Sequence, residues 1–173
     1  IGDASYGFVI KGTGHNLTTN NGTVTLGNDS VFAYSDKTGT MTNRTQLVST
    51  GSGNYGLYSA GNVVNNTSGN MNLTSGVGNV GIYSINGGTA SNSSGASITV
   101  GASSVGNPNP SDNYYAIGMA AGYYGDASSP AYTGNILNSG TINVTGENSI
   151  GMYGTESGTT VTNNGVINLS ASN

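Results

Sequence analysis

Apolar and polar residues alternate in short stretches along the whole chain. The alternation is clear in Thr23-Val24-Thr25-Leu26, and it returns in Thr141-Ile142-Asn143-Val144 and in Val166-Ile167-Asn168-Leu169. A period of two puts successive side chains on opposite faces, so each stretch predicts a β-strand with one buried face. Gly, Asn, Ser and Thr are poor helix formers, and no 3.6-residue stripe is visible. The pattern therefore predicts an all-β fold.

A strand of the form Gly-apolar-Tyr opens a unit that recurs along the chain. Its clearest copies are Tyr55–Ser59, Val80–Ser84 and Ile150–Gly154, and the second position falls at residues 7, 32, 56, 81, 118 and 151. The spacings are 25, 24, 25, 37 and 33 residues. An Asn-Gly turn, a second strand and a weaker third strand complete each unit, which is the pattern of one β-helix coil. We predict a right-handed parallel β-helix of about six coils, forming a single domain over residues 1–173.

Stacked coils place like positions over one another and so predict ladders of identical side chains. The alternation within the first strand puts Val80 and Ile82 on one face and Gly81 and Tyr83 on the other. Asn tolerates the left-handed conformation of a tight corner and can hydrogen-bond its neighbours in the stack. The predicted structural ladders comprise Tyr34, Tyr58, Tyr83 and Tyr153, and Asn20, Asn43, Asn66, Asn92, Asn138 and Asn163. The tyrosine row could instead grip an extended glycan, but stacking is favoured because the row follows the repeat itself.

Two insertions interrupt the repeat. The first covers residues 101–113 and contains Pro108 and Pro110, and the second covers about 122–133 and contains Pro130. Loops that leave a regular solenoid often carry binding residues, and tyrosine offers a rigid, amphipathic contact surface. The candidate ligand-binding residues are Tyr114, Tyr115, Tyr123, Tyr124, Tyr132, Asp112 and Asp126. The alternative is that both loops are spacers that cover the core.

Composition excludes several classes of function. The chain has only 3 Lys and Arg residues against 7 Asp and Glu residues, which gives a net charge of -4. Such a chain has no basic surface for nucleic acid or for anionic lipid headgroups. It has no apolar run long enough for a transmembrane helix, so we expect no direct membrane insertion of this segment. It also has no cysteine, which excludes disulfides and thiolate metal sites.

Residues suited to catalysis or metal binding are few. His15 is the only histidine, and it lies in a turn-like segment. The carboxylates are scattered along the chain, and Asp112 and Asp126 are the one pair that could meet across the two insertions. A catalytic site needs convergent groups, so we expect no enzyme and no catalytic residue. No calcium-binding repeat is present, so we expect no metal and no cofactor.

The pairing of the Gly-apolar-Tyr strand with the Asn-x-Gly strand resembles the passenger domains of large bacterial autotransporter adhesins of the fusobacterial type. The resemblance covers essentially the whole chain. It departs at Phe32, which replaces the glycine, and at Ala120, which replaces the tyrosine. It implies a place on the bacterial cell surface, tethered to the outer membrane by a barrel outside this chain. It also implies attachment to host cells or other bacteria through a glycan or a protein.

A passive spacer stalk, with binding elsewhere in the parent protein, is the main alternative to an adhesive segment. A β-helical enzyme that degrades surface polysaccharide is the other alternative. We also expect possible end-to-end self-association, because uncapped strand edges invite pairing between copies.

Overall fold

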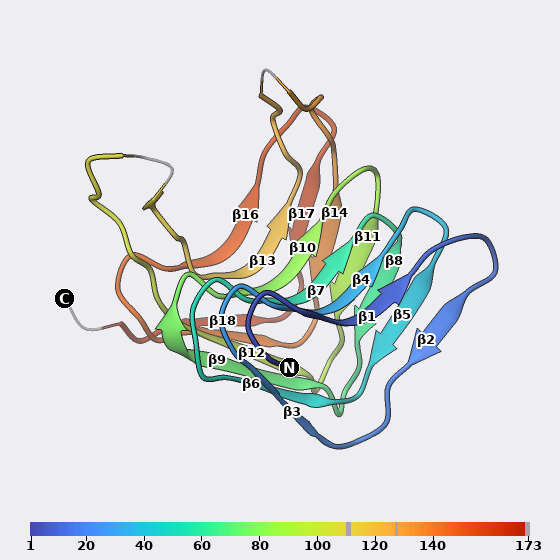
Figure 1. Cartoon of the computed structure of the whole chain (residues 1–173), viewed down its shortest axis with the longest axis horizontal. Coiled ribbons are helices and arrows are strands. Elements are labelled where there is room, and N and C mark those ends of the chain that lie inside the picture. Colours follow the sequence, from blue (N-terminus) through green and yellow to red (C-terminus); the bar gives the residue numbers. More distant parts are fainter. Residues whose placement is uncertain (110–111, 127, 172–173) are drawn as a thin grey trace.

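The computed structural model describes residues 1–109, 112–126 and 128–171, and within them eighteen strands wind into a solenoid (Figure 1). Each coil contributes one strand to each of three parallel six-stranded sheets. Sheet A contains β1 (Tyr6–Ile10), β4 (Val31–Ser35), β7 (Tyr55–Ser59), β10 (Val80–Ser84), β13 (Ile117–Ala121) and β16 (Ile150–Gly154). Sheet B contains β2 (Asn16–Thr18), β5 (Thr40–Asn43), β8 (Asn62–Asn65), β11 (Thr89–Asn92), β14 (Asn135–Asn138) and β17 (Thr160–Asn163). Sheet C contains β3 (Thr23–Leu26), β6 (Gln46–Ser49), β9 (Asn70–Val77), β12 (Ser97–Ala102), β15 (Thr141–Val144) and β18 (Val166–Leu169).

Like positions of successive coils pair in register. Tyr58 pairs with Tyr83 in sheet A, Asn92 pairs with Asn138 in sheet B, and Ile98 pairs with Ile142 in sheet C. The prediction of a right-handed parallel β-helix of about six coils is therefore confirmed.

The core is a thin apolar column enclosed by the three sheets. Fully buried aliphatic and methionine side chains from all three sheets form this column. A single coil has too few of them to form a core alone, so the coils must stack to bury them. They include Leu47, Leu57, Val63, Met71, Leu73, Ile82, Ile98, Val100, Met119, Ile136 and Ile142.

The prediction that Gly81 and Tyr83 share a face is wrong. A Cβ atom added to Gly81 would lie 2.5 Å from Cγ2 of Ile98, so this glycine faces the core. Ile82 is also fully buried, and the strand therefore departs from strict alternation at the glycine. The physical reason is space, because the bulky side chain of Ile98 in sheet C occupies the volume that the glycine leaves free. Val80 and Tyr83 consequently line the outer face of sheet A.

A buried amide ladder runs along sheet B at the corner toward sheet C. Side-chain amide groups donate to the next Oδ1 from Asn43 to Asn65 at 2.9 Å, from Asn65 to Asn92 at 2.9 Å, and from Asn92 to Asn138 at 2.8 Å. Asn138 continues the ladder to Asn163 at 2.8 Å, and Thr19 begins it with a 3.1 Å bond to Asn43.

Two of the predicted ladder residues are wrong by one position. Asn20 is exposed and Asn66 is partly exposed, while Thr19 and Asn65 occupy the buried rungs. The buried position is the last residue of the sheet B strand, because Asn65 ends β8 and pairs with Asn43 and Asn92. Asn65 and Asn66 are adjacent and fit the sequence pattern equally well, so only the end of β8 decides between them.

A second polar ladder, which the sequence did not indicate, precedes sheet A. Asn79 Oδ1 accepts hydrogen bonds from the backbone and side-chain nitrogens of Asn54, at 2.9 and 3.0 Å. Asn54 Oδ1 in turn accepts one from the backbone nitrogen of Ser30 at 3.0 Å. Asn54 and Asn79 are both buried, so this ladder fixes the turns that lead into β4, β7 and β10.

Both insertions emerge from the fifth coil, one at each end of β13. Residues 103–116 precede β13 and are closed by an antiparallel bridge between Ser104 and Tyr114. Residues 122–134 follow β13 and are closed by a similar bridge between Tyr123 and Tyr132. Figure 1 shows the two loops on opposite sides of sheet A, where they rise past its outer face. Pro110 lies outside the described residues.

No candidate for a membrane-crossing helix is present in residues 1–109, 112–126 and 128–171.

Candidate functional site: an aromatic groove on sheet A

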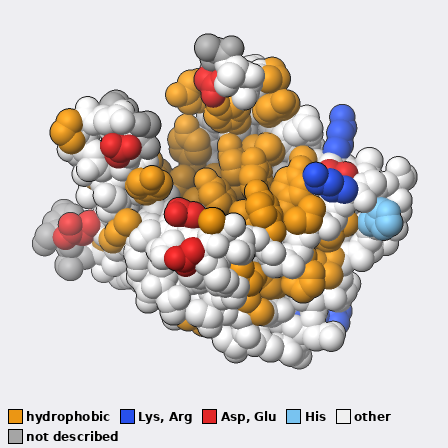
Figure 2. All heavy atoms as spheres, viewed as in Figure 1, with side chains coloured by type: hydrophobic (Ala, Val, Ile, Leu, Met, Phe, Trp, Pro, Cys, Tyr) orange, Lys and Arg blue, Asp and Glu red, His pale blue; other side chains and the backbone are white. Residues whose placement is uncertain are grey.

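The outer face of sheet A forms a groove with an apolar floor. Figure 2 shows the gathered hydrophobic side chains in the hollow between the two loops. The main hollow has a volume of about 540 Å³, and smaller ones of about 460, 370 and 180 Å³ continue it along the sheet. We call this surface the aromatic groove, and its aromatic and aliphatic lining comprises Tyr6, Val9, Val31, Tyr34, Tyr55, Tyr58, Val80, Tyr83, Tyr114, Tyr115, Ile117, Ala120, Ile150 and Tyr153.

Stacked tyrosine rings form the floor. The ring centroids of Tyr58 and Tyr83 lie 5.2 Å apart with 21° between their planes, and Tyr55 stacks on both at 5.6 and 6.0 Å. Tyr34 meets Tyr58 edge to face at 5.6 Å. Such contacts are favourable beyond the area that they bury, so the floor is held in one arrangement.

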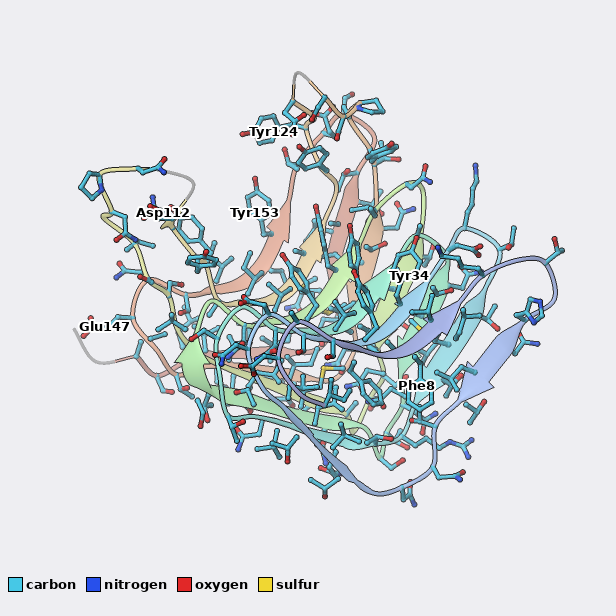
Figure 3. The ribbon with its side chains drawn as sticks, viewed as in Figure 1. Phe8, Tyr34, Asp112, Tyr124, Glu147 and Tyr153 are labelled. Atoms are coloured by element: carbon cyan, nitrogen blue, oxygen red, sulfur yellow. The ribbon has the colours of Figure 1, made fainter. Side chains whose placement is uncertain are left out.

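The first loop builds one wall. Tyr114 and Tyr115 both line the main hollow, and about half of each side chain is exposed (49% and 46%). Tyr115 also faces Tyr153 of β16 across the smaller hollow of about 370 Å³. In Figure 3, Tyr153 projects from β16 into the space between the loops. These exposed rings give a ligand access to aromatic faces that the stacked floor does not offer.

The second loop stands on the opposite side of sheet A, and Gly122 at its base is its residue that lines the groove. Tyr123 and Tyr124 stack with ring centroids 6.1 Å apart, and Tyr124 is the most exposed tyrosine of the chain's described aromatic residues at 70%. The hydroxyl of Tyr83 donates to the carbonyl oxygen of Gly122 at 3.0 Å, which fastens the floor to the base of this loop. The loop therefore holds a fixed position beside the groove.

Asp126 organises the second loop. Its carboxylate accepts hydrogen bonds from the Tyr123 hydroxyl, from the backbone and side chain of Ser128 at 2.7 Å each, and from the Ser129 backbone at 2.9 Å. These bonds, that from Tyr123 first, hold the pKa of Asp126 well below its ordinary value. Tyr132 supports the same loop through its bridge with Tyr123.

Asp112 lies apart from Asp126. It lines a separate hollow of about 330 Å³ with Asp29, Ser52 and Tyr114, at the base of the first loop. Figure 1 places the two loops on opposite sides of sheet A, and Asp126 does not line this hollow, so the structure does not join the two carboxylates into one site. No group of three His, Asp or Glu side chains that could hold a metal ion occurs in the part of the chain that the structure describes.

The floor carries no charge at neutral pH. Burial, followed by the neighbouring tyrosines, raises the pKa of Tyr58 to about 12, and the same causes raise the pKa of Tyr83. Burial also raises the pKa of Tyr55. Lys11 lies at one end of the groove, and Asp29 borders the main hollow. The groove is therefore an uncharged aromatic surface with acidic and basic groups only at its margins.

The structure brings some of the predicted residues together in the groove and adds others that the repeat spacing did not indicate. Tyr34, Tyr58, Tyr83 and Tyr153 form one outward row, and Tyr114 and Tyr115 face that row from the first loop. Tyr55, Val80 and Ile117 were missed because alternation assigned them to the core. Tyr6 and Tyr55 occupy the same position of the repeat as Val80. A polar hydroxyl group is unusual in a core, so these two tyrosines are the sequence feature that indicates an outward-facing position.

Comparison with known proteins places the chain in a family. A family model described as the BigA third pectate lyase-like domain matches residues 50–173. No curated protein and no solved structure showed significant similarity to the chain. BigA is a bacterial surface protein, which is consistent with the resemblance to a passenger domain of a large surface protein. Because the match extends over more than half of the sequence, the chain belongs to the family of the BigA third pectate lyase-like domain.

Proposed function

We propose that this domain is an adhesive segment of a bacterial surface protein and that the aromatic groove is its binding surface. The observation that carries the proposal is the set of exposed rings that line the groove, at Tyr114, Tyr115 and Tyr153. Water-exposed aromatic clusters are uncommon on proteins without a partner, and they mark binding sites when polar residues surround them. Tyrosine is also among the residues enriched at the energetic centres of interfaces.

The placement of the loops supports the same proposal. Both insertions leave one coil, and both rise beside the outer face of sheet A. A pair of loops on one face of a regular solenoid is what a binding site requires.

The family and the resemblance together support a proposal for the cellular setting. A surface protein whose passenger carries this domain would be tethered by an outer-membrane barrel outside this chain, and it would present the groove to host cells or to other bacteria. The ligand would be a surface protein or glycan. We expect no catalysis, since Asp112 and Asp126 stand on separate loops and Asp126 is already engaged within its own loop.

A passive spacer stalk is the second candidate function. The buried amide ladder supports it, because a continuous chain of hydrogen bonds from Asn43 to Asn163 stiffens the solenoid whether or not the groove binds anything. The two functions differ in one respect that can be measured, which is binding by the isolated domain.

The test is binding of the fluorescently labelled chain to epithelial cells and to bacterial cells, measured by flow cytometry. The variant combines Tyr115→Ala with Tyr153→Ala, and Asn72→Ala on the exposed face of sheet C is the matched control. Truncation of an aromatic at an interface centre costs about 2 kcal/mol or more, so we expect at least a tenfold loss of apparent affinity. Absence of binding by the wild type would favour the spacer stalk. Equal binding by variant and wild type would show that the domain binds through a surface other than the aromatic groove.

A further inference from the structure

The tyrosine row of sheet A has one missing rung. Tyr34, Tyr58, Tyr83, Ala120 and Tyr153 are paired neighbours in register, so Ala120 stands where a ring would otherwise stack. We propose that the gap above Ala120 receives an aromatic side chain of a protein partner. This inference deepens the proposed function, on which it rests, by giving the chemical class of the ligand.

The spacing of the strands suits one inserted ring. Ala120 pairs with Tyr83 on one side and with Tyr153 on the other, so the backbones of these tyrosines are about 9.6 Å apart, or two strand spacings. Tyr58 and Tyr83, which are one spacing apart, stack with centroids at 5.2 Å. A ring placed over Ala120 would therefore lie at about stacking distance from both neighbours.

The gap is a defined hollow, which we call the slot. It has a volume of about 180 Å³ and is lined by Tyr55, Val80, Tyr83, Ile117, Ala120, Gly122 and Tyr153. An apolar cavity of about 150 Å³ is large enough to bind benzene in another protein. The slot therefore has room for the ring of one tyrosine or phenylalanine side chain.

The lining favours an aromatic side chain over a sugar. Val80, Ile117 and Ala120 offer only carbon atoms, and the hydroxyl of Tyr83 already donates to Gly122. A pyranose would bring several hydroxyl groups into a space with few partners, and each unsatisfied polar group is costly. An aromatic ring has no such requirement and gains stacking on both faces.

The acidic residues near the slot indicate the charge of the partner segment that would carry the aromatic ring. Asp29 borders the main hollow, Asp112 lies at the foot of the first loop, and Asp126 lies in the second loop, whose base at Gly122 lines the slot. The chain as a whole has a net charge of -4. Electrostatic complementarity therefore favours an aromatic residue with a lysine or arginine beside it.

The first test uses small probes and NMR of the methyl groups of Val80, Ile117 and Ala120. The probes are the N-acetylated amides of tyrosyl-lysine, leucyl-lysine and tyrosyl-glutamate, together with methyl β-galactoside. We expect ring-current shifts with tyrosyl-lysine, at least threefold weaker binding of tyrosyl-glutamate, and no shifts with leucyl-lysine. Absence of shifts with tyrosyl-lysine, or larger shifts at these methyls with the galactoside, would overturn the proposal. Methyl shifts that depend on protein concentration without any probe would assign the slot to a second copy and would also overturn it.

The second test fills the slot with the protein's own side chain. Ala120→Tyr completes the row, and four of the six coils already hold tyrosine at this position, so we expect the variant to fold. Ala120→Ser is the matched control that leaves the slot open. The tyrosyl-lysine shifts and cell binding should be lost in Ala120→Tyr and kept in Ala120→Ser.

The outcome also separates the two proposals. If the wild type binds cells and Ala120→Tyr binds them equally well, the slot proposal fails while the adhesive function stands. If the wild type binds no cells, the adhesive function fails, and the probe titration decides the slot by itself.

Discussion

The side-chain amide of Asn92 donates to Oδ1 of Asn138 at 2.8 Å, although 46 residues separate the two in the chain. Both side chains are fully buried. The same bond recurs from Asn43 to Asn65, from Asn65 to Asn92 and from Asn138 to Asn163, so each amide satisfies the next. The ladder thereby allows polar side chains to lie inside a core that has few apolar residues.

Removal of one rung should destabilise the whole stack. Asn92→Ala leaves Oδ1 of Asn138 buried without its donor, and an unsatisfied buried group costs about 1–3 kcal/mol. We expect the free energy of unfolding to fall by about 2 kcal/mol in urea denaturation. Asn20→Ala is the control, because Asn20 is exposed, and it should change stability by less than about 0.5 kcal/mol. Equal effects of the two substitutions would contradict the assigned register.

The inward glycine of sheet A should not tolerate a methyl group. A Cβ atom at Gly81 would lie 2.5 Å from both the Gly118 carbonyl oxygen and the Ile98 side chain. Overpacking of this kind costs about 1–3 kcal/mol, so Gly81→Ala should lower the melting temperature clearly. Gly22→Ala is the matched control, because no atom lies within 4 Å of its Cβ position. A Gly81→Ala variant as stable as the wild type would mean that this glycine faces solvent.

The free energy of unfolding should fall at alkaline pH, because the Tyr58 hydroxyl in the groove floor loses its proton. The pKa of Tyr58 rises from 10.0 to about 12 on folding, chiefly because of burial, so the native state holds this proton more tightly than the unfolded state. The contribution of protonated Tyr58 to the free energy of unfolding is complete below pH 10 and is lost as the pH rises through 12. Urea denaturation between these values should show a falling free energy of unfolding. Tyr58→Phe keeps the ring and removes the proton, so a decline of the same steepness in this variant would contradict the assignment.

The isolated chain should associate end to end at high concentration. β1, β2 and β3 at one end, and β16, β17 and β18 at the other, each pair with a neighbour on one side only. Leu169 of β18 is 76% exposed at the second end. Light scattering should show a mass that rises with concentration, and Leu169→Lys should reduce the rise because charge on an edge opposes pairing. A strict monomer at every concentration would count against open edges.

Periodicity was sufficient to predict the fold. Because Tyr58, Tyr83 and Tyr153 recur with like neighbours, the in-register stacking of their strands followed from the sequence alone. The register of Asn65 was missed because two adjacent asparagines, Asn65 and Asn66, satisfy the same pattern and only the strand end decides between them.

The groove was only partly predictable. Tyr114 and Tyr115 were identified from loop composition, but strict alternation assigned Tyr55 and Val80 to the core. Alternation fails at Gly81, where the missing side chain allows the strand to present two successive positions inward. Such a departure depends on the volume of Ile98 in a different sheet, which no local pattern contains. The importance of Ala120 likewise appears only when Tyr83 and Tyr153 are seen on either side of it.

The central claim is that like positions of the six coils lie over one another, because this register assembles the groove. The chain has no cysteine, so paired spin labels can be introduced at single chosen sites. Thr25 and Asn168 occupy the same position in the first and last strands of sheet C, with Asn143 one coil before the last. Double electron–electron resonance should give a backbone separation of about 24 Å for Thr25→Cys with Asn168→Cys, and about 5 Å less for Thr25→Cys with Asn143→Cys. Distances that do not shorten by one strand spacing, or that are broadly distributed, would contradict the stacked register and the groove that depends on it.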